Sequence, residues 1–212
     1  DDNGNVYKMN GRLIENTTYE IKGITYITDE YGRIVKWSCK SNYEPENERD
    51  NNAQIESGGD DREDGDDGGH LVARILGGPP GEENIVPMRD TINRGDYKKS
   101  ENALVEATKQ GKTVEDKGEV IYEGDSKRPS KIERTYDIDG EKTYLKIDNI
   151  KESTELIRDF ENDISSIDLE NLKDEINDMK ADGEKVSVTS VMKKYDANGN
   201  LLSVCVGIRN ET

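Results

Sequence analysis

Residues 66–74 read DDGGHLVAR, and residues 84–101 read NIVPMRDTINRGDYKKSE. The glycines and prolines of residues 77–81 separate the two apolar segments that these stretches contain. A helix is expected over Thr91–Gln110, because apolar residues recur on one face and Gly111 can take the C′ position. The stretch therefore predicts two short apolar segments followed by one helix.

On both sides of this stretch, alternating apolar and polar residues predict β-strands. The expected strands are Asn5–Met9, Arg12–Ile14, Thr18–Thr28 and Arg33–Lys40 before it, and Val114–Tyr122, Lys131–Asp137 and Lys142–Ile147 after it. Ser41–Gly69 is rich in Asn, Asp, Glu and Gly and is expected to be a long loop. We therefore expect an α+β fold built on an antiparallel sheet.

The pattern changes beyond Asn149, where apolar residues step by three and four as in a helix. These positions are Leu156, Ile157, Phe160, Leu169, Leu172, Ile176 and Met179. A closing hairpin is expected from Lys185–Tyr195 and Leu201–Ile208. We expect residues 1–148 to form the main domain. Residues 149–212 would then be a helix-and-hairpin segment that either completes this domain or forms a small appendage.

The composition excludes several classes of protein. The 212 residues carry 30 Lys and Arg against 47 Asp and Glu, a net charge of −17. One histidine and two cysteines cannot build a disulfide scaffold or a structural zinc site. No apolar run approaches the roughly 20 residues of a membrane-spanning helix. So acidic a chain repels nucleic acid at long range, and binding to nucleic acid would require a local basic cleft.

The negative charge is unevenly distributed along the chain. Residues 43–67 hold eleven carboxylates against Arg49 and Arg62, whereas residues 70–112 hold seven Lys and Arg against six Asp and Glu. The nearly neutral stretch is the one that contains the only histidine, His70. The chain also begins without an initiator methionine or an apolar leader, so we expect an excised piece from which either a signal or a longer N-terminal region has been removed.

His70 by itself could be an ordinary polar residue. Its neighbours favour a functional role, because the glycines before it allow the backbone to approach a ligand closely. Asn84, Asn93 and Glu101 then follow at intervals of fourteen, nine and eight residues. Taken singly, the two asparagines also fit turns or helix caps, and the nearby Lys and Arg residues fit the polar face of a helix.

Taken together, these residues resemble the DNA/RNA non-specific endonuclease family, the ββα-metal nucleases, and in particular its bacterial secreted-toxin branch. The resemblance is carried by Asp-Gly-Gly-His at 67–70, Asn-Ile-Val-Pro-Met at 84–88, Asn-Arg-Gly-Asp-Tyr at 93–97 and the helical Glu101. It covers about residues 58–147. It implies an antiparallel sheet with a ββα-metal motif, in which the first strand ends at the histidine and the helix holds a metal ion.

The resemblance implies a role for each matching residue. His70 matches the general base, Asn84 a supporting asparagine, Asn93 the metal ligand and Glu101 a glutamate near the metal-bound waters. Gly68 stands where many relatives have a phosphate-binding arginine, so that role is absent or falls to Arg74, Arg89 or Arg94. The chemistry is consistent, because a neutral imidazole can accept a proton near pH 7. One amide oxygen suits Mg²⁺ (or Mn²⁺), which keeps most of its waters.

The implied function is metal-dependent, non-specific endonucleolytic cleavage of DNA, with RNA left open. The chain would be the C-terminal toxin domain of a larger secreted bacterial protein, used in interbacterial competition and held inactive by a cognate immunity protein. Three alternatives stay open: a non-catalytic binding or scaffold module with a degenerate motif, an acidic loop that docks a partner protein, and a cysteine beside His70 acting as nucleophile.

Overall fold

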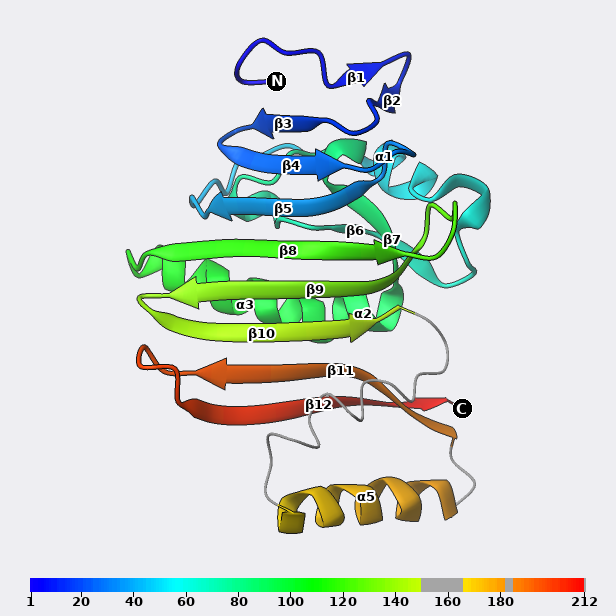
Figure 1. The fold of residues 1–212 in the computed structure, drawn as a ribbon, viewed down its shortest axis with the longest axis vertical. Coiled ribbons are helices and arrows are strands. Elements are labelled where there is room, and N and C mark those ends of the chain that lie inside the picture. Colours follow the sequence, from blue (N-terminus) through cyan, green and yellow to red (C-terminus); the bar gives the residue numbers. More distant parts are fainter. Residues whose placement is uncertain (150–165, 182–184, 212) are drawn as a thin grey trace.

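The computed structural model describes residues 1–149, 166–181 and 185–211, and one large antiparallel sheet forms its centre (Figure 1). Its strands lie in the order β12-β11-β10-β9-β8-β5-β4-β3. They are β3 (Thr18–Ile21), β4 (Ile24–Thr28), β5 (Ile34–Lys40), β8 (Val114–Tyr122), β9 (Pro129–Ile138), β10 (Glu141–Asp148), β11 (Lys185–Tyr195) and β12 (Leu201–Glu211). The mixed fold with a large antiparallel sheet and few helices is confirmed. A small separate sheet joins β1 (Lys8–Met9) and β2 (Arg12–Leu13).

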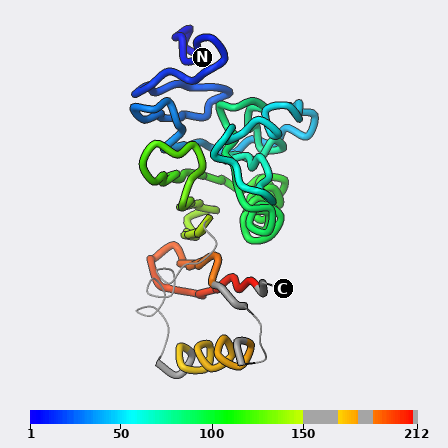
Figure 2. Tube along the Cα trace, turned by 90° about the vertical axis from the view of Figure 1, so that its right-hand side faces the viewer, coloured from blue at the N-terminus to red at the C-terminus, as the bar shows by residue number. Residues whose placement is uncertain are grey.

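A second layer covers one face of this sheet (Figure 2). It contains the antiparallel pair β6 (Asp66–His70) and β7 (Ile85–Arg89), in which His70 lies opposite Ile85. The helices of this layer are α1 (Asn51–Glu56), α2 (Asp90–Arg94) and α3 (Asp96–Lys109). Short 3₁₀ turns lie at Gly59–Asp61, Arg74–Leu76 and Glu82–Asn84. Residues 66–101, which contain His70, Asn84, Asn93 and Glu101, therefore lie in one layer that packs on the sheet.

Helix α3 packs on the sheet because its buried residues recur at helical spacing. These are Tyr97, Ser100, Glu101, Leu104 and Ala107. Below them, Arg134 of β9 donates two hydrogen bonds of 2.8 Å to Asp116 of β8, and both side chains are fully buried. Arg134 also donates to Ser100 Oγ at 3.1 Å, which fixes α3 to the sheet. A buried charge is tolerated when it is paired in this way.

Three expected elements differ from the structure. The expected strand Thr18–Thr28 is a hairpin of two strands, β3 and β4, because the chain turns at Lys22 and Gly23, which both have positive φ. The expected loop Ser41–Gly69 contains α1, whose N-cap Asp50 accepts from two backbone N–H groups, and most of β6. The expected helix Thr91–Gln110 is broken at Gly95 into α2 and α3. A Cβ at Gly95 would lie 2.3 Å from the carbonyl oxygen of Thr91, so only glycine permits this close turn.

The C-terminal segment continues the main sheet. β11 pairs with β10 from Lys142↔Tyr195 to Ile147↔Ser190, and β12 pairs with β11. Helix α5 (Ser166–Ala181) contributes Ile176 to a small apolar cluster with Val188 and Val191 of β11. The predicted helical positions Leu156, Ile157 and Phe160 lie outside the described residues. Within the described part of the chain, no helix is long and apolar enough to cross a membrane.

Candidate active site

His70 ends strand β6 and is mostly buried. Its Nε2 atom is buried and has no hydrogen-bond partner among the described residues. A buried polar atom without a partner costs roughly 1–3 kcal/mol, so such atoms are rare and call for an explanation. The chain therefore keeps this nitrogen unpaired at an energetic cost, as a binding or catalytic site can require.

The surroundings of His70 keep its imidazole neutral. Burial lowers its pKa from the ordinary 6.5 to about 4, and the positive charges of Arg49, Arg74 and Lys98 act in the same direction. These three cations come from the segment before α1, from the turn after β6 and from α3. A protein with a net charge of −17 thus places three positive side chains around one neutral imidazole.

Asn93 of α2 faces strand β6. Its Nδ2 donates to Asp67 Oδ2 at 3.0 Å, and Asp67, when ionised, can only accept. The amide oxygen must then point the other way, and a Cβ built on Gly69 would lie 3.1 Å from Asn93 Oδ1. Asp67 therefore orients an amide oxygen toward the residue that precedes His70.

Arg94 strengthens this orientation. It donates to both carboxylate oxygens of Asp67, at 2.8 Å from Nε and 2.7 Å from Nη2. Burial raises the pKa of Asp67, but the hydrogen bonds from Arg94 and Asn93 outweigh it and hold that pKa below its ordinary value. The sequence predicted Asn93 and Arg94 as site residues but missed Asp67, which precedes the Gly-Gly-His stretch and links them.

Asn84 is fully buried, and each of its hydrogen-bonding positions is used by the protein itself. Its Oδ1 accepts from the Tyr26 hydroxyl and from Val72 N, both at 2.9 Å. Its Nδ2 donates to the carbonyl oxygens of Val72 and Pro79, at 2.9 and 3.0 Å. Asn84 thus fixes the segment that follows His70, and it has no capacity left for a substrate.

Glu101 lies on α3, so it does not share a continuous helix with Asn93. Only 8% of the residue is exposed, and its Oε2 accepts from Lys98 Nζ at 3.0 Å. Lys98 is also one of the cations that lower the pKa of His70. The structure thus connects Glu101 to the surroundings of His70 through Lys98.

The arginines expected to bind phosphate occupy different environments. Arg74 donates to the backbone oxygens of Asn47 and Pro45, while Arg94 is bound to Asp67 and has a side chain 69% exposed. Arg89 is only 6% exposed, and this burial argues against a contact with phosphate at the surface. Arg49 was not singled out by the sequence, yet it is exposed, makes no ion pair with any described residue and lies near His70.

The position of Arg49 follows from anchors on both sides of it. Two residues earlier, Asn47 Nδ2 donates to the carbonyl oxygens of Arg74 and Gly78, at 2.9 and 2.8 Å. One residue later, Asp50 caps α1. Because the chain is fixed at both points, Arg49 stays near the end of β6. No sequence pattern could reveal this, because the anchors join residues about 30 positions apart.

The cysteines do not supply a nucleophile next to the imidazole. Cys39 lies on β5 at the edge of the main core, and burial raises the pKa of its thiol to about 12. Such a thiol is protonated at neutral pH and is a poor nucleophile. Cys205 is exposed on β12, at the other end of the sheet.

The atoms that could bind a metal ion at this site suit a cation that keeps most of its own waters. Among the described residues, no cluster of three His, Cys, Asp or Glu side chains could hold a metal ion. The Oδ1 of Asn93 accepts no hydrogen bond from any described residue, so it is available as a ligand. A single amide oxygen suits Mg²⁺ better than Zn²⁺, which takes nitrogen, sulfur and carboxylate ligands in closed sites.

Comparison with known proteins decides the family. A family model described as DNA/RNA non-specific endonuclease matches residues 15–140, more than half of the chain. The chain belongs to this family. The matched region includes the whole layer that carries His70, Asn93 and Glu101.

Relatives of this chain include two larger bacterial proteins. "Type VII secretion system protein EssD" of Staphylococcus aureus (strain USA300) is 37% identical over 133 residues, covering 60% of this chain and 22% of EssD. "Probable deoxyribonuclease RhsA" of Dickeya dadantii (strain 3937) is 33% identical over 86 residues, covering 40% of this chain and 6% of that protein. The chain therefore spans less than a quarter of either relative. Among solved structures, NucA from Streptococcus agalactiae with no metal bound aligns with a TM-score of 0.48 and 15% identity, over 64% of this chain and 84% of NucA.

Helix α1 packs directly against Gly68 and leaves no space for a side chain at this position. A Cβ at Gly68 would lie 2.4 Å from the carbonyl oxygen of Gln54, so α1 covers this position completely. Arg62 fixes the contact, because it donates to Gln54 O at 2.7 Å and to the carbonyl oxygen of Asp66. Position 68 therefore has no room for an arginine, and Arg49 is the exposed arginine nearest in sequence to the covering helix.

Proposed function

We propose that this chain is a metal-dependent, non-specific endonuclease that hydrolyses phosphodiester bonds of DNA, with RNA as the alternative substrate. The observation that carries the proposal is the buried, unpartnered Nε2 of His70. Family membership indicates action on nucleic acid, and the strand-strand-helix order of β6, β7 and α2 supports a ββα-metal site.

In this mechanism, His70 accepts a proton from the attacking water. Its imidazole is neutral at physiological pH and can therefore act as a general base. Asn93 would hold Mg²⁺ through Oδ1, and the ion would supply positive charge for the phosphate and the leaving oxygen. Asp67 holds Asn93 in the required orientation, and Glu101 together with Lys98 would order the solvent around the ion.

The positive side chains around His70 would bind the scissile phosphate. Arg49 is the best placed, because it is exposed and makes no ion pair with a described residue. Arg74 holds neighbouring backbone, and Lys98 is shared with Glu101. Arg94 can contribute from its exposed position beside Asp67. A guanidinium suits this role because it binds phosphate oxygens in pairs.

We further propose the biological setting that the sequence suggested. EssD is named as a type VII secretion system protein and RhsA as a deoxyribonuclease, and this chain matches only a small part of each. The chain would be the C-terminal toxin domain of a larger secreted bacterial protein, acting in a target cell during interbacterial competition. A cognate immunity protein would hold it inactive in the producing cell.

The test incubates the chain with supercoiled plasmid and, separately, with total RNA. We expect cleavage with Mg²⁺ or Mn²⁺, none with EDTA, and a loss of at least about 100-fold in His70→Ala. Lys112→Ala, at an exposed lysine outside the site, is the matched control and should cleave normally. Unchanged cleavage by His70→Ala would overturn the assignment. No cleavage by the wild type would favour a binding module.

A further inference from the structure

The C-terminal hairpin β11–β12 contacts the start of helix α3, although it lies outside residues 15–140, the part of the chain that the family model matches. Ser190 of β11 donates a hydrogen bond from its hydroxyl to Oδ2 of Asp96, the first residue of α3. The two residues are 94 positions apart in the chain. The hairpin is thus bonded to the helix that begins shortly after Asn93.

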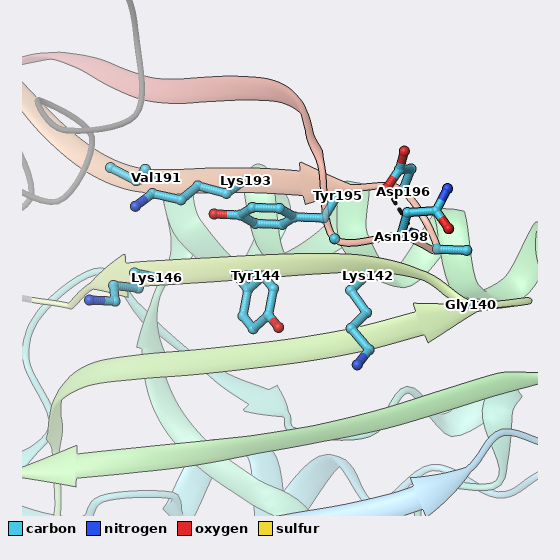
Figure 3. A pocket seen from close by; sticks show the side chains of 11 residues that line it. Gly140, Lys142, Tyr144, Lys146, Val191, Lys193, Tyr195, Asp196 and Asn198 are labelled. Atoms are coloured by element: carbon cyan, nitrogen blue, oxygen red, sulfur yellow. Dashed lines mark hydrogen bonds between the residues drawn. The ribbon is translucent and has the colours of Figure 1, made fainter.

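Ser190 points toward α3 because of its place on β11. Figure 3 shows Val191, Lys193 and Tyr195 of the same strand lining a pocket on the face of the sheet away from α3. Successive residues of a strand face opposite sides, so Ser190 faces the side on which α3 packs. The register agrees, because Ser190 lies opposite Ile147, which is buried in the main core. The pairing of β11 with β10 therefore directs this hydroxyl at α3.

Gly207 of β12 provides the space for the contact. It lies opposite Ser190 in the hairpin. A Cβ at this position would overlap both Oδ2 of Asp96 and the hydroxyl oxygen of Ser190. Any larger residue would have to displace one of these two groups. Both strands of the hairpin therefore contribute to the contact with α3.

The start of α3 has no side-chain cap of its own. Its N-cap is Gly95, which has no side chain that could accept from the free backbone N–H groups. Asp96 has a second partner, since its Oδ1 accepts from Lys99 Nζ at 2.9 Å, but that lysine side chain is 76% exposed. Exposed ion pairs of this kind stabilise weakly. Ser190 is only 3% exposed, so its hydrogen bond is the stronger constraint on the carboxylate.

We propose that the hairpin β11–β12 is a positioning element for the candidate metal site. Ser190 holds Asp96, and Asp96 fixes the start of α3. The turn that precedes it is close, because Gly95 N donates to Ile92 O at 3.2 Å. A shift of Asp96 would therefore also move Asn93. The inference rests on the proposed function for the role of Asn93 as metal ligand, but the effect of the hairpin on α2 requires no metal.

Amide hydrogen exchange of the full chain, followed by NMR in EDTA, tests the positioning without metal or substrate. The amides of Gly95 and Lys99 report on the junction, because they donate to the carbonyl oxygens of Ile92 and Gly95. We expect Ser190→Ala to speed their exchange about 10-fold, because a hydrogen bond to a charged group is lost. Amides of the central strands β8 and β9 report on global stability and should keep their rates. Ser203→Ala, at an exposed position of β12, is the matched control and should change neither set.

Two further variants test whether Ser190 acts through Asp96. Gly207→Ala keeps the serine but displaces one of the two bonded groups, so it should speed exchange at Gly95 as well. In an Asp96→Ala background, Ser190→Ala should have little further effect, because the acceptor is already absent.

Metal binding is the second readout. Titration calorimetry with Mn²⁺ should give a Kd about fivefold higher in Ser190→Ala than in the wild type, as expected when the support of a metal ligand is loosened. In plasmid cleavage, the metal concentration for half-maximal rate should rise by the same factor, while the rate at saturating metal changes less than about twofold. Ser203→Ala should match the wild type in both measurements.

The pattern of exchange decides between support in the two directions. Faster exchange confined to β11 and β12, with Gly95 and Lys99 unchanged, would show that α3 only holds the hairpin and would overturn the proposal. Equal acceleration in β8 and β9 would show a general loss of stability and would overturn it too. Absence of Mn²⁺ binding by the wild type would instead contradict the proposed metal site, and the exchange rates in EDTA would still show whether the hairpin positions α2.

Discussion

The burial of His70 determines the pH range in which the proposed chemistry can operate. A general base must be unprotonated, and the pKa of this imidazole is lowered to about 4, chiefly by burial. We therefore expect kcat/KM to stay level from neutral pH down to about 5 and to fall only as the pH approaches 4. A pH profile of plasmid cleavage checks this, with circular dichroism at each pH to confirm that the chain is folded.

Arg49→Gln is the matched variant for this profile. Arg49 contributes to the lowered pKa of His70, so its removal should raise that pKa and move the acid limb toward higher pH. An acid limb near 6.5 in the wild type would contradict the buried environment of the imidazole. A limb that does not move in the variant would show that Arg49 lies too far away to act on His70.

A second prediction at the residue scale concerns the hydrogen bond between Asp67 and Asn93. The amide introduced by Asp67→Asn can both donate and accept hydrogen bonds. It therefore no longer forces the amide oxygen of Asn93 toward the site. We expect the Mg²⁺ concentration for half-maximal cleavage to rise about 10-fold or more, because residues that orient a metal ligand have effects of this size. Asp64→Asn changes the same charge at an exposed position and is the control. An equal effect in both variants would show that Asp67 acts only through its negative charge and does not orient Asn93.

Asn93 and His70 could be predicted as site residues from their residue types and spacing, but their geometry could not. The role of Asp67 depends on Asn93, which lies 26 positions away and comes into reach only when α2 packs on β6. Arg49 is placed by hydrogen bonds from Asn47 to a turn about 30 positions later. Contacts over such separations leave no local pattern in a single sequence.

At the scale of elements, the contact of α1 with β6 makes a prediction about Gly68. Introducing at position 68 the arginine that the family resemblance led us to expect should not increase cleavage, because the backbone of Gln54 occupies the space. We expect Gly68→Arg to lower the free energy of unfolding by at least about 1–3 kcal/mol, as overpacking does. Urea unfolding followed by tryptophan fluorescence measures this, since Trp37 lies in the main core.

Gly68→Ala isolates the steric cause, because it adds the Cβ without a charge. Both variants should be destabilised, and neither should cleave faster than the wild type. Faster cleavage by Gly68→Arg in a stably folded chain would show that α1 can move aside and that the position still binds phosphate.

The same contact explains why the elements around it were hard to predict. β6 is composed of Asp, Gly and His, which have low strand propensity, and it forms because it pairs with β7 and is covered by α1. The break between α2 and α3 depends on the close approach of Gly95 to Thr91. By contrast, the central strands β8, β9 and β10 follow the alternating pattern closely, because one face of each is buried.

At the scale of the whole molecule, a net charge of −17 repels the substrate that the site is proposed to cleave. Binding must then depend on a few cations whose field is felt only at short range. Arg49, Arg74 and Lys98 supply positive charge that acts on His70. The acidic surface would limit unspecific adhesion to nucleic acid, and the local cations would direct the phosphate to the imidazole.

This balance predicts how salt affects the enzyme. Screening weakens both the general repulsion and the local attraction, and Arg49 contributes only to the attraction. We expect Arg49→Gln to lower kcat/KM about 10-fold at low salt, roughly 1.4 kcal/mol, with a smaller loss at high salt. Arg12→Gln, at an exposed arginine of β2, changes the net charge equally and should alter kcat/KM little. Equal losses in the two variants would show that overall charge, and not a contact of Arg49 with phosphate, controls the encounter.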